Sequence, residues 1–209
     1  MSLLSRTHGA CVHGRRVKVL ASHFARVIPQ AARTVLDVGC GDGLLASELQ
    51  KLRPGLVIHG LDVLERPKAA IPVTIFDGAH LPFGNREFDA VLFADVLHHT
   101  SDPCVLLGEA ARVAREGLAI KDHLKQGFLS FRTLSFMDWM GNAAHGVALP
   151  YNYWRPDQWT SAFRDLGLET VCWETRLGLY PWPARLLFER LLHFVAWIQA
   201  PKTPAISSC

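Results

Sequence analysis

The segment that most constrains the fold is a short apolar run followed by closely spaced glycines. Residues 34–45 read Thr-Val-Leu-Asp-Val-Gly-Cys-Gly-Asp-Gly-Leu-Leu. The apolar residues suit a strand buried on both faces, as in a parallel sheet. Gly39, Gly41 and Gly43 permit backbone angles and close approaches that a side chain would block. The helical pattern that begins at Leu44 places a helix N-terminus beside this loop, where a polar or anionic part of a nucleotide-like ligand can bind.

Two details of this segment distinguish between nucleotides. A dinucleotide fingerprint needs Gly or Ala at its third glycine position, and Leu44 stands there, which argues against a dinucleotide oxidoreductase. Asp37 stands two residues before the first glycine, at the carboxyl end of the expected strand. The pattern Asp-x-Gly-x-Gly resembles the first motif of the class I S-adenosylmethionine-dependent methyltransferases. A glycine turn alone also fits a purely structural strand-to-helix connection. The motifs that follow in the chain distinguish a cofactor-binding loop from such a connection.

The resemblance implies S-adenosylmethionine as the cofactor and S-adenosylhomocysteine as the product. It implies that Gly39 and Gly41 lie against the methionine portion and the ribose. Asp37 would orient the loop and the amino end of the methionine. Cys40, between the two glycines, is included in the predicted cofactor site.

A second apolar run, residues 56–63, ends in an acid roughly twenty residues after the glycine turn. A carboxylate at the end of the second strand can accept hydrogen bonds from both ribose hydroxyls. The alternative is a solvated aspartate at a strand end. It is disfavoured because both the position and the residue type are those that a nucleotide site requires at the end of its second strand. Asp62 is therefore predicted to bind the ribose, and Val63 is included beside it.

A third strand is expected over residues 71–76, followed by Asp-Gly-Ala-His-Leu-Pro-Phe over residues 77–83. This sequence resembles the adenine-side loop of the same enzymes. The resemblance implies that Asp77 accepts a hydrogen bond from the adenine amine, while Gly78 and Ala79 admit the flat ring.

The rest of the pattern predicts an α/β fold. Strands are expected over residues 88–94, 117–123, 169–175 and 193–198, with a turn over residues 115–117. Alternating strands and helices predict a parallel sheet with helices on both faces and a ligand beyond the carboxyl ends of its strands. The family resemblance implies a Rossmann-like, mostly parallel seven-stranded sheet in the order 3-2-1-4-5-7-6, with the last strand antiparallel. Asp95, after the fourth strand, is included in the cofactor site.

Composition narrows the class of protein. The 209 residues, 49% of them hydrophobic, predict one domain over 1–209, as monomer or homodimer. A net charge of +3 gives no reason to expect a nucleic-acid partner. Near the N-terminus, a cluster of basic residues is interpreted as a solvated helix face, with a phosphate-binding patch as the alternative. The cluster consists of Arg15, Arg16, Lys18 and Arg26. No apolar run approaches the ~20 residues that span a bilayer. Five widely spaced cysteines indicate reduced thiols and a cytoplasmic protein.

Residues 124–160 are aromatic and are not required by the basic fold, so they are predicted to form a cap on the substrate side. A helix is expected over residues 128–140, ended by Gly141 and Asn142. Because pockets are lined mainly by apolar and aromatic side chains, we expect a small, moderately apolar or aromatic acceptor. The apolar connection over residues 177–192 is expected to pack under the sheet, with contact to a membrane or partner subunit as the alternative.

Methyl transfer needs a base only where the acceptor must lose a proton. His123 is the first candidate and His99 the second, while Tyr153 is a candidate to orient the acceptor. Either His98 or His99 could instead be structural. Asp95, His99, Asp122 and His123 have spacings that match no metal-ligand signature, so no metal is predicted.

The function predicted from the sequence is direct in-line methyl transfer to a small molecule. Residues 94–97 lack the Asn/Asp-Pro-Pro-Tyr signature of amino-group methylation, which weakens DNA and release-factor substrates. The alternative is a nonenzymatic S-adenosylmethionine-binding partner or regulatory protein. Such a protein would keep the cofactor residues and lack an acceptor pocket.

Overall fold

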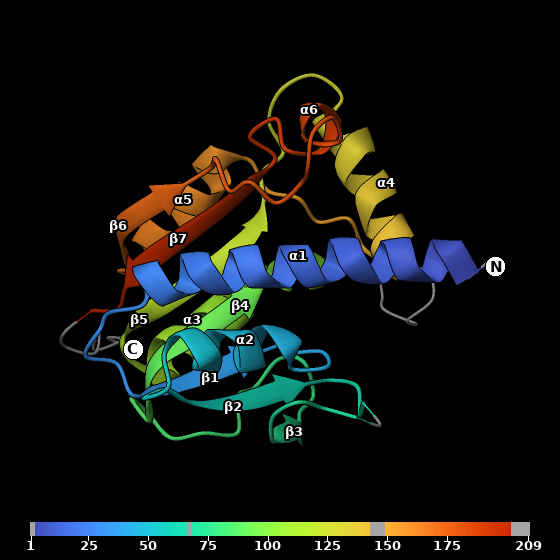
Figure 1. The fold of residues 1–209 in the computed structure, drawn as a ribbon. Helices are drawn as coiled ribbons and strands as arrows, with labels where there is room; N and C mark the ends of the chain where they lie inside the picture. Colours follow the sequence, from blue (N-terminus) through green and yellow to red (C-terminus); the bar gives the residue numbers. More distant parts are fainter. Residues whose placement is uncertain (1–2, 67, 143–148, 202–209) are drawn as a thin grey trace.

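The computed structural model describes residues 3–66, 68–142 and 149–201 as a sheet with helices on both faces (Figure 1). The strands are β1 Thr34–Val38, β2 Val57–Asp62, β3 Val73–Ile75, β4 Phe88–Ala94, β5 Ala114–His123, β6 Glu169–Glu174 and β7 His193–Gln199. The helices are α1 Leu3–Val27, α2 Leu44–Leu52, α3 Pro103–Val113, α4 Ser130–Asn142, α5 Pro156–Asp165 and α6 Arg185–Phe188, with a 3-10 turn η1 Leu97–His99. Within these described ranges, no helix combines the length and the apolar character needed to cross a bilayer.

The strand order is β3-β2-β1-β4-β5-β7-β6, as the family resemblance implied. The pairs from β3 to β5 are parallel, and β7 runs antiparallel to both β5 and β6. In register, Asp37 of β1 stands opposite Gly60 of β2 and Leu92 of β4. The carboxyl ends of the central strands therefore meet at one edge of the sheet, where the predicted ligand-binding acids stand.

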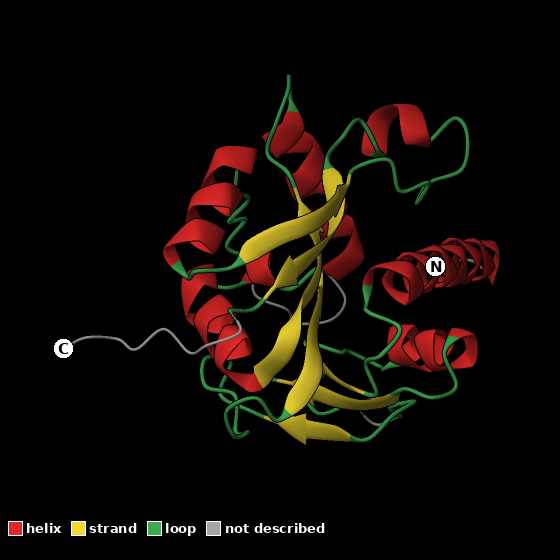
Figure 2. Cartoon of the chain, turned by 90° about the vertical axis from the view of Figure 1, so that its left-hand side faces the viewer, coloured by secondary structure: helices red, strands yellow, loops and turns green. Residues whose placement is uncertain are grey.

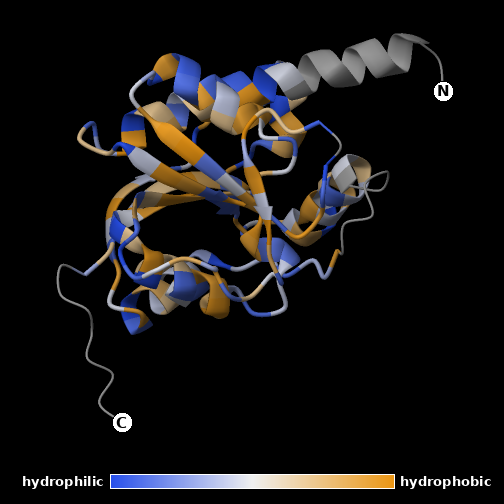
Figure 3. Ribbon diagram, turned by 90° about the horizontal axis from the view of Figure 1, so that it is seen from below, coloured by the Kyte–Doolittle hydropathy of each residue, from blue (hydrophilic) through white to orange (hydrophobic). Residues whose placement is uncertain are grey.

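Two hydrophobic layers hold the helices against the sheet. On one face α1 and α2 pack, through residues such as Phe24 and Leu49, on Val35 and Leu92. On the other face α3 and α5 cover alternate residues of the same strands, such as Leu36. Viewed along the sheet, the strands lie between these helical layers (Figure 2). The hydropathy colouring shows the strands as mostly apolar (Figure 3).

One sequence-based boundary is wrong. The turn expected over residues 115–117 is absent, because α3 ends at Val113 and β5 begins at the next residue. Gly117 lies within β5, where a Cβ would collide with the carbonyl of Ile198 on β7, so this glycine serves close strand packing. The helix expected over residues 128–140 is α4, which runs Ser130–Asn142 and has Gly141 and Asn142 as its last two residues.

The expected packing of residues 177–192 under the sheet is confirmed only for its first part. Leu177 and Leu179 are buried against the α1 side of the sheet. Trp182, Leu186 and Leu187 are exposed instead. The reason is that α6 lies beside α4, away from the sheet (Figure 1).

Candidate functional site

A cavity of about 650 Å³ opens at the carboxyl ends of the central strands. Its lining includes most of the residues that the sequence assigned to a cofactor, together with one candidate base. These are Asp37, Gly39, Cys40, Gly41, Asp62, Val63, Gly78, Asp95 and His99. The sequence pattern therefore converges on one site.

The glycine loop after β1 is held in a conformation that excludes larger residues. Gly39 has φ +71°, and a Cβ on it would overlap the side chain of Val96. Its N–H donates to the Leu61 carbonyl over 2.6 Å. The next glycine, Gly41, donates its N–H to Asp62 Oδ2 over 2.8 Å. The carboxylate that ends β2 thus fixes the loop and also faces the cavity.

Asp37 carries an unsatisfied carboxyl oxygen at this site. Its side chain is buried, and Oδ2 has no hydrogen-bond partner among the described residues. Burial, together with the nearby charge of Asp62, raises the pKa of Asp37 to about 7. A buried carboxyl oxygen that faces a cavity and lacks a donor is suited to a cationic ammonium group. The α-amino group of S-adenosylmethionine is such a cation, so the residues present fit this cofactor.

The loop after β3 contributes to the cavity through Phe76 and Gly78. Asp77 does not line the cavity, and neither does Ala79. The Asp77 carboxylate accepts the N–H groups of Ala79 and His80, each over 2.8 Å, and pairs with His80 Nδ1 at 3.0 Å. These hydrogen bonds lower the pKa of Asp77 and hold the turn that presents Gly78.

A buried ionic network begins at Asp95, just after β4. Its carboxylate accepts hydrogen bonds from Arg16 of α1 and from Lys121 of β5, whose side chain is fully buried. Burial alone would raise the pKa of Asp95, but these two cations outweigh it and lower the pKa. The prediction of a solvated face is therefore wrong for Arg16, which lines the cavity. A long-range ion pair of this kind leaves no local signal in the sequence.

His98 is the centre of the second part of the network. Its Nδ1 lies 2.6 Å from Asp122 Oδ1, and its Nε2 lies 3.2 Å from Asp138 Oδ2. Burial lowers the pKa of His98, but the two carboxylates outweigh it and raise the pKa to about 10. His98 is therefore an imidazolium at neutral pH.

His99 is the histidine that reaches the cavity wall. Its ring lies 4.1 Å from the ring of His98, centroid to centroid. Burial and the positive charge of His98 both lower the pKa of His99. A neutral imidazole thus lines the cavity, and this is the protonation state that can accept a proton.

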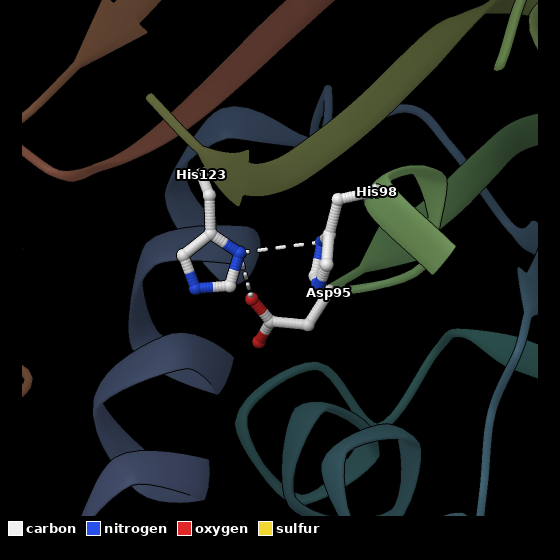
Figure 4. A group of neighbouring side chains, drawn as sticks. All are labelled: Asp95, His98 and His123. Atoms are coloured by element: carbon white, nitrogen blue, oxygen red, sulfur yellow. Dashed lines mark hydrogen bonds and ion pairs between the residues drawn. The ribbon is translucent and has the colours of Figure 1, made fainter. Parts of the chain in front are cut away.

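The other two catalytic candidates lie behind the cavity wall. His123 Nδ1 is 3.2 Å from His98 Nδ1 and 3.7 Å from Asp95 Oδ1 (Figure 4). Burial and the charge of Lys121 lower the pKa of His123. Tyr153 is buried and donates its hydroxyl hydrogen to Asp138. Neither His123 nor Tyr153 is among the residues that line the cavity.

Asp95, His98 and His123 have ligand-capable atoms within 4.8 Å of one another. This spacing is compatible with a bound metal ion. However, the Asp95 carboxylate already accepts a hydrogen bond from Lys121, and Nδ1 of His98 is already hydrogen-bonded to Asp122. We therefore interpret the group as a hydrogen-bonded ionic network, and the sequence-based expectation that no metal binds stays a prediction.

Sequence reasoning missed several residues of the cavity wall. They include Arg16, Phe76, Val96, Thr100 and Ser101. The last three belong to the segment after β4, whose Leu-His-His sequence was a usable signal. Arg16 comes from a helix far away in the sequence and had no such signal.

Comparison with known proteins identifies the family. A methyltransferase domain model matches residues 12–172. The uncharacterized methyltransferase Rv3342 of Mycobacterium tuberculosis is 36% identical over 98 residues, which cover 44% of this chain and 39% of that protein. The ubiquinone biosynthesis O-methyltransferase of Thiobacillus denitrificans is 26% identical over 119 residues, which cover 51% of this chain and 47% of that protein. The match thus spans less than half the length of either curated relative.

The fold is shared with solved methyltransferase structures. One of them is the complex between the Haloferax volcanii Trm112 methyltransferase activator and a methyltransferase. That structure has a TM-score of 0.67 and 18% identity, and the alignment covers 92% of each chain. Since the family model covers most of the sequence and the sheet has the expected strand order, this chain belongs to the class I S-adenosylmethionine-dependent methyltransferases.

Proposed function

We propose that the cavity binds S-adenosylmethionine and that the protein transfers its methyl group to a small, moderately apolar or aromatic acceptor. The observation that carries this proposal is the unpartnered Oδ2 of Asp37, buried beside the glycine loop at the cavity wall. It supplies a counter-ion for the amino end of the cofactor. On the other side of the glycine loop, Asp62 also lines the cavity. Its carboxylate can accept hydrogen bonds from ribose hydroxyls.

The remaining cofactor contacts follow from the lining residues. Gly39, Cys40 and Gly41 would lie against the methionine portion. Val63 and Gly78 would flank the adenine. Both line the cavity, and a Cβ on Gly78 would approach Val63 within 3.2 Å.

We propose an indirect role for Asp77. Its carboxylate already accepts two N–H groups of its own loop and is largely exposed. Asp77 and Ala79 would therefore shape the adenine side through the position of Gly78. A direct bond from Asp77 to the adenine amine, as the resemblance implied, would need this carboxylate to turn towards the cavity.

When bound, the sulfonium cofactor supplies an already activated methyl group. The protein's task is to align the acceptor and to exclude water. Asp95 is fixed between Arg16 and Lys121, so it can form a rigid wall on the reacting side of the cavity. Direct in-line displacement requires such a fixed geometry.

For an acceptor that must lose a proton, we propose His99 as the base. It lines the cavity, and its pKa is lowered, so that it is neutral at pH 7. His123, the first candidate from the sequence, would position His98 and Asp95 from behind the wall. Tyr153 would hold Asp138, which lies against His98 on its other side.

The acceptor class rests on residues 124–160, which we propose as an acceptor-side cap within a single domain. Phe131 and Tyr153 form an edge contact at 5.9 Å between ring centroids, close to the histidine network. A relative named for ubiquinone biosynthesis O-methylation supports a ring-bearing acceptor. The aromatic composition of the cap favours the same class.

The experiment is a transfer assay with S-adenosylmethionine that carries a tritiated methyl group. Phenols, hydroxy acids and amines are screened as acceptors, and label is counted in the extracted product. A His99→Gln variant serves as the test of the base, and the exposed-site variant Asp165→Asn serves as the control. Methylated product with the wild type supports the proposal. Cofactor binding without transfer to any class of acceptor would favour a nonenzymatic binding protein.

A further inference from the structure

The helix α4 and the segment around α6 carry a second functional surface. Large apolar side chains there are exposed, with 85% of Phe128, 56% of Trp139 and 60% of Leu187 accessible. We define the α4–α6 face by its exposed apolar residues. They are Phe128, Phe136, Trp139, Trp182, Leu186 and Leu187.

The α4–α6 face is one continuous surface because its two segments are tied together. Arg190 donates to the Thr133 hydroxyl over 2.8 Å, and Gln126 donates to the Leu191 carbonyl over 2.8 Å. The helices α4 and α6 are in contact and lie side by side (Figure 1). Exposed apolar residues scattered singly need no explanation, whereas a contiguous group marks an interaction site.

The charges around this face are of one sign. Four basic side chains of the same segments are exposed: Lys125, Arg132, Arg185 and Arg190. Among the salt bridges of the described residues, none involves any of these four.

The acids of these segments point away from the face. Asp138 is buried and accepts the Tyr153 hydroxyl. Glu189 accepts the N–H groups of Gly178 and Leu179. The apolar face is therefore bordered by cations whose charge is not neutralised by neighbouring carboxylates.

We propose that the α4–α6 face binds peripherally to an anionic lipid surface. Aromatic and leucine side chains can enter the boundary between head groups and acyl chains, while Lys and Arg pair with lipid phosphates. A second copy of this chain fits less well. A two-fold dimer through this face would bring the same four cations of both copies together. This proposal goes beyond methyl transfer, and its test needs no acceptor.

The test is flotation of the purified chain with vesicles on a density gradient. Vesicles of phosphatidylcholine alone are compared with vesicles that contain about one third phosphatidylglycerol. We expect flotation with the anionic vesicles and at least about tenfold weaker binding to the neutral ones. Raising the salt from 0.1 M to 0.5 M should weaken binding, because the head-group attraction is screened.

Two variants test the two parts of the surface. The double variant Trp139→Gln/Leu187→Gln removes apolar side chains, and Arg132→Glu/Arg185→Glu reverses charges. Each should weaken binding by about tenfold or more. The matched controls are Val171→Gln and Lys51→Glu, which change exposed residues on β6 and α2 and should bind as the wild type does.

Each variant is first checked for the wild-type circular dichroism spectrum and for S-adenosylmethionine binding. If one double variant fails to fold, the other still tests the surface. The proposal is overturned if the wild type does not float with anionic vesicles, or if both double variants bind as the controls do. It is also overturned if light scattering shows a dimer that Trp139→Gln/Leu187→Gln converts to a monomer, because the face would then bind a second copy.

Discussion

Replacement of Asp37 by asparagine should stabilise the cofactor-free protein at pH 8 and weaken cofactor binding. The pKa of Asp37 is raised from 3.8 to about 7, first by burial and then by Asp62. The folded state therefore favours the neutral carboxyl. The contribution of the Asp37 carboxyl to the free energy of unfolding is fully present below the unfolded pKa near 3.8. This contribution is lost as the pH rises through the folded pKa of about 7.

The size of the effect follows from the pKa difference. At ~1.4 kcal/mol per pKa unit, the rise from 3.8 to about 7 sets an upper limit of about 4 kcal/mol at pH 8. The asparagine amide would itself lack a partner at the position of Oδ2, which costs ~1–3 kcal/mol. The expected net gain is about 1–3 kcal/mol, or roughly 2–12 °C in Tm for a chain of this size.

The assay is thermal unfolding of Asp37→Asn and wild type at pH 4, 6 and 8, with Asp165→Asn as an exposed control. The gain in Tm should be largest at pH 8. At pH 4, where the wild-type carboxyl is neutral, only the cost of the unpartnered amide remains, so the variant should have a lower Tm than the wild type. Calorimetry at pH 8 should show S-adenosylmethionine binding weakened by about 10-fold to 100-fold, since a charge-assisted contact is lost. A variant that is equally destabilised at every pH, or that binds as tightly as the wild type, would refute this reasoning.

Four further predictions test other parts of the site. Wild-type affinity for S-adenosylmethionine should rise between pH 6 and pH 8, because Asp37 must ionise to pair with the ammonium; a flat calorimetric profile contradicts this. Gly39→Ala should abolish cofactor binding, since a Cβ would overlap Val96 at a φ of +71°, and retained binding would show that the loop can move. His99→Gln should lower kcat by about 100-fold with an acceptor that must be deprotonated, while cofactor affinity measured by calorimetry stays unchanged; equal kcat would exclude His99 as the base. Lys121→Met should lower the free energy of unfolding by about 3–5 kcal/mol, because Asp95 loses a buried partner. Denaturant titration measures this loss, and a loss below ~1 kcal/mol would show that the ion pair contributes little to stability.

Local signals accounted for the sheet and for most of the cofactor loop. The apolar run before Asp37 and the acid at Asp62 predict strands and their ends directly, because strand length, periodicity and terminal residues are encoded over a few positions. The structure places both acids on the lining of one cavity. The start of β5 was missed because Gly117 suggested a turn, whereas close contact with β7 is what requires a glycine there.

Long-range contacts could not be predicted in the same way. Arg16 and Lys121 meet at Asp95 from elements far apart in the chain, and their charges alone fit a solvated surface equally well. The position of His123 at the carboxyl end of an expected strand favours it over His99 as the base. The structure buries His123 behind His98, and the direction in which a side chain leaves a strand end depends on packing that the sequence does not state.

The most direct measurement is a calorimetric titration of the purified chain with S-adenosylmethionine and S-adenosylhomocysteine, repeated with Asp62→Asn and Asp77→Asn. Wild-type binding with a dissociation constant of roughly 1–100 μM is expected. Asp62→Asn should bind the cofactor at least about tenfold more weakly, because it loses the carboxylate that accepts hydrogen bonds from the ribose hydroxyls. Asp77→Asn should lose less of its affinity for the cofactor. Absence of binding by the folded wild type, or equal binding by Asp62→Asn, would contradict the placement of the cofactor in this cavity.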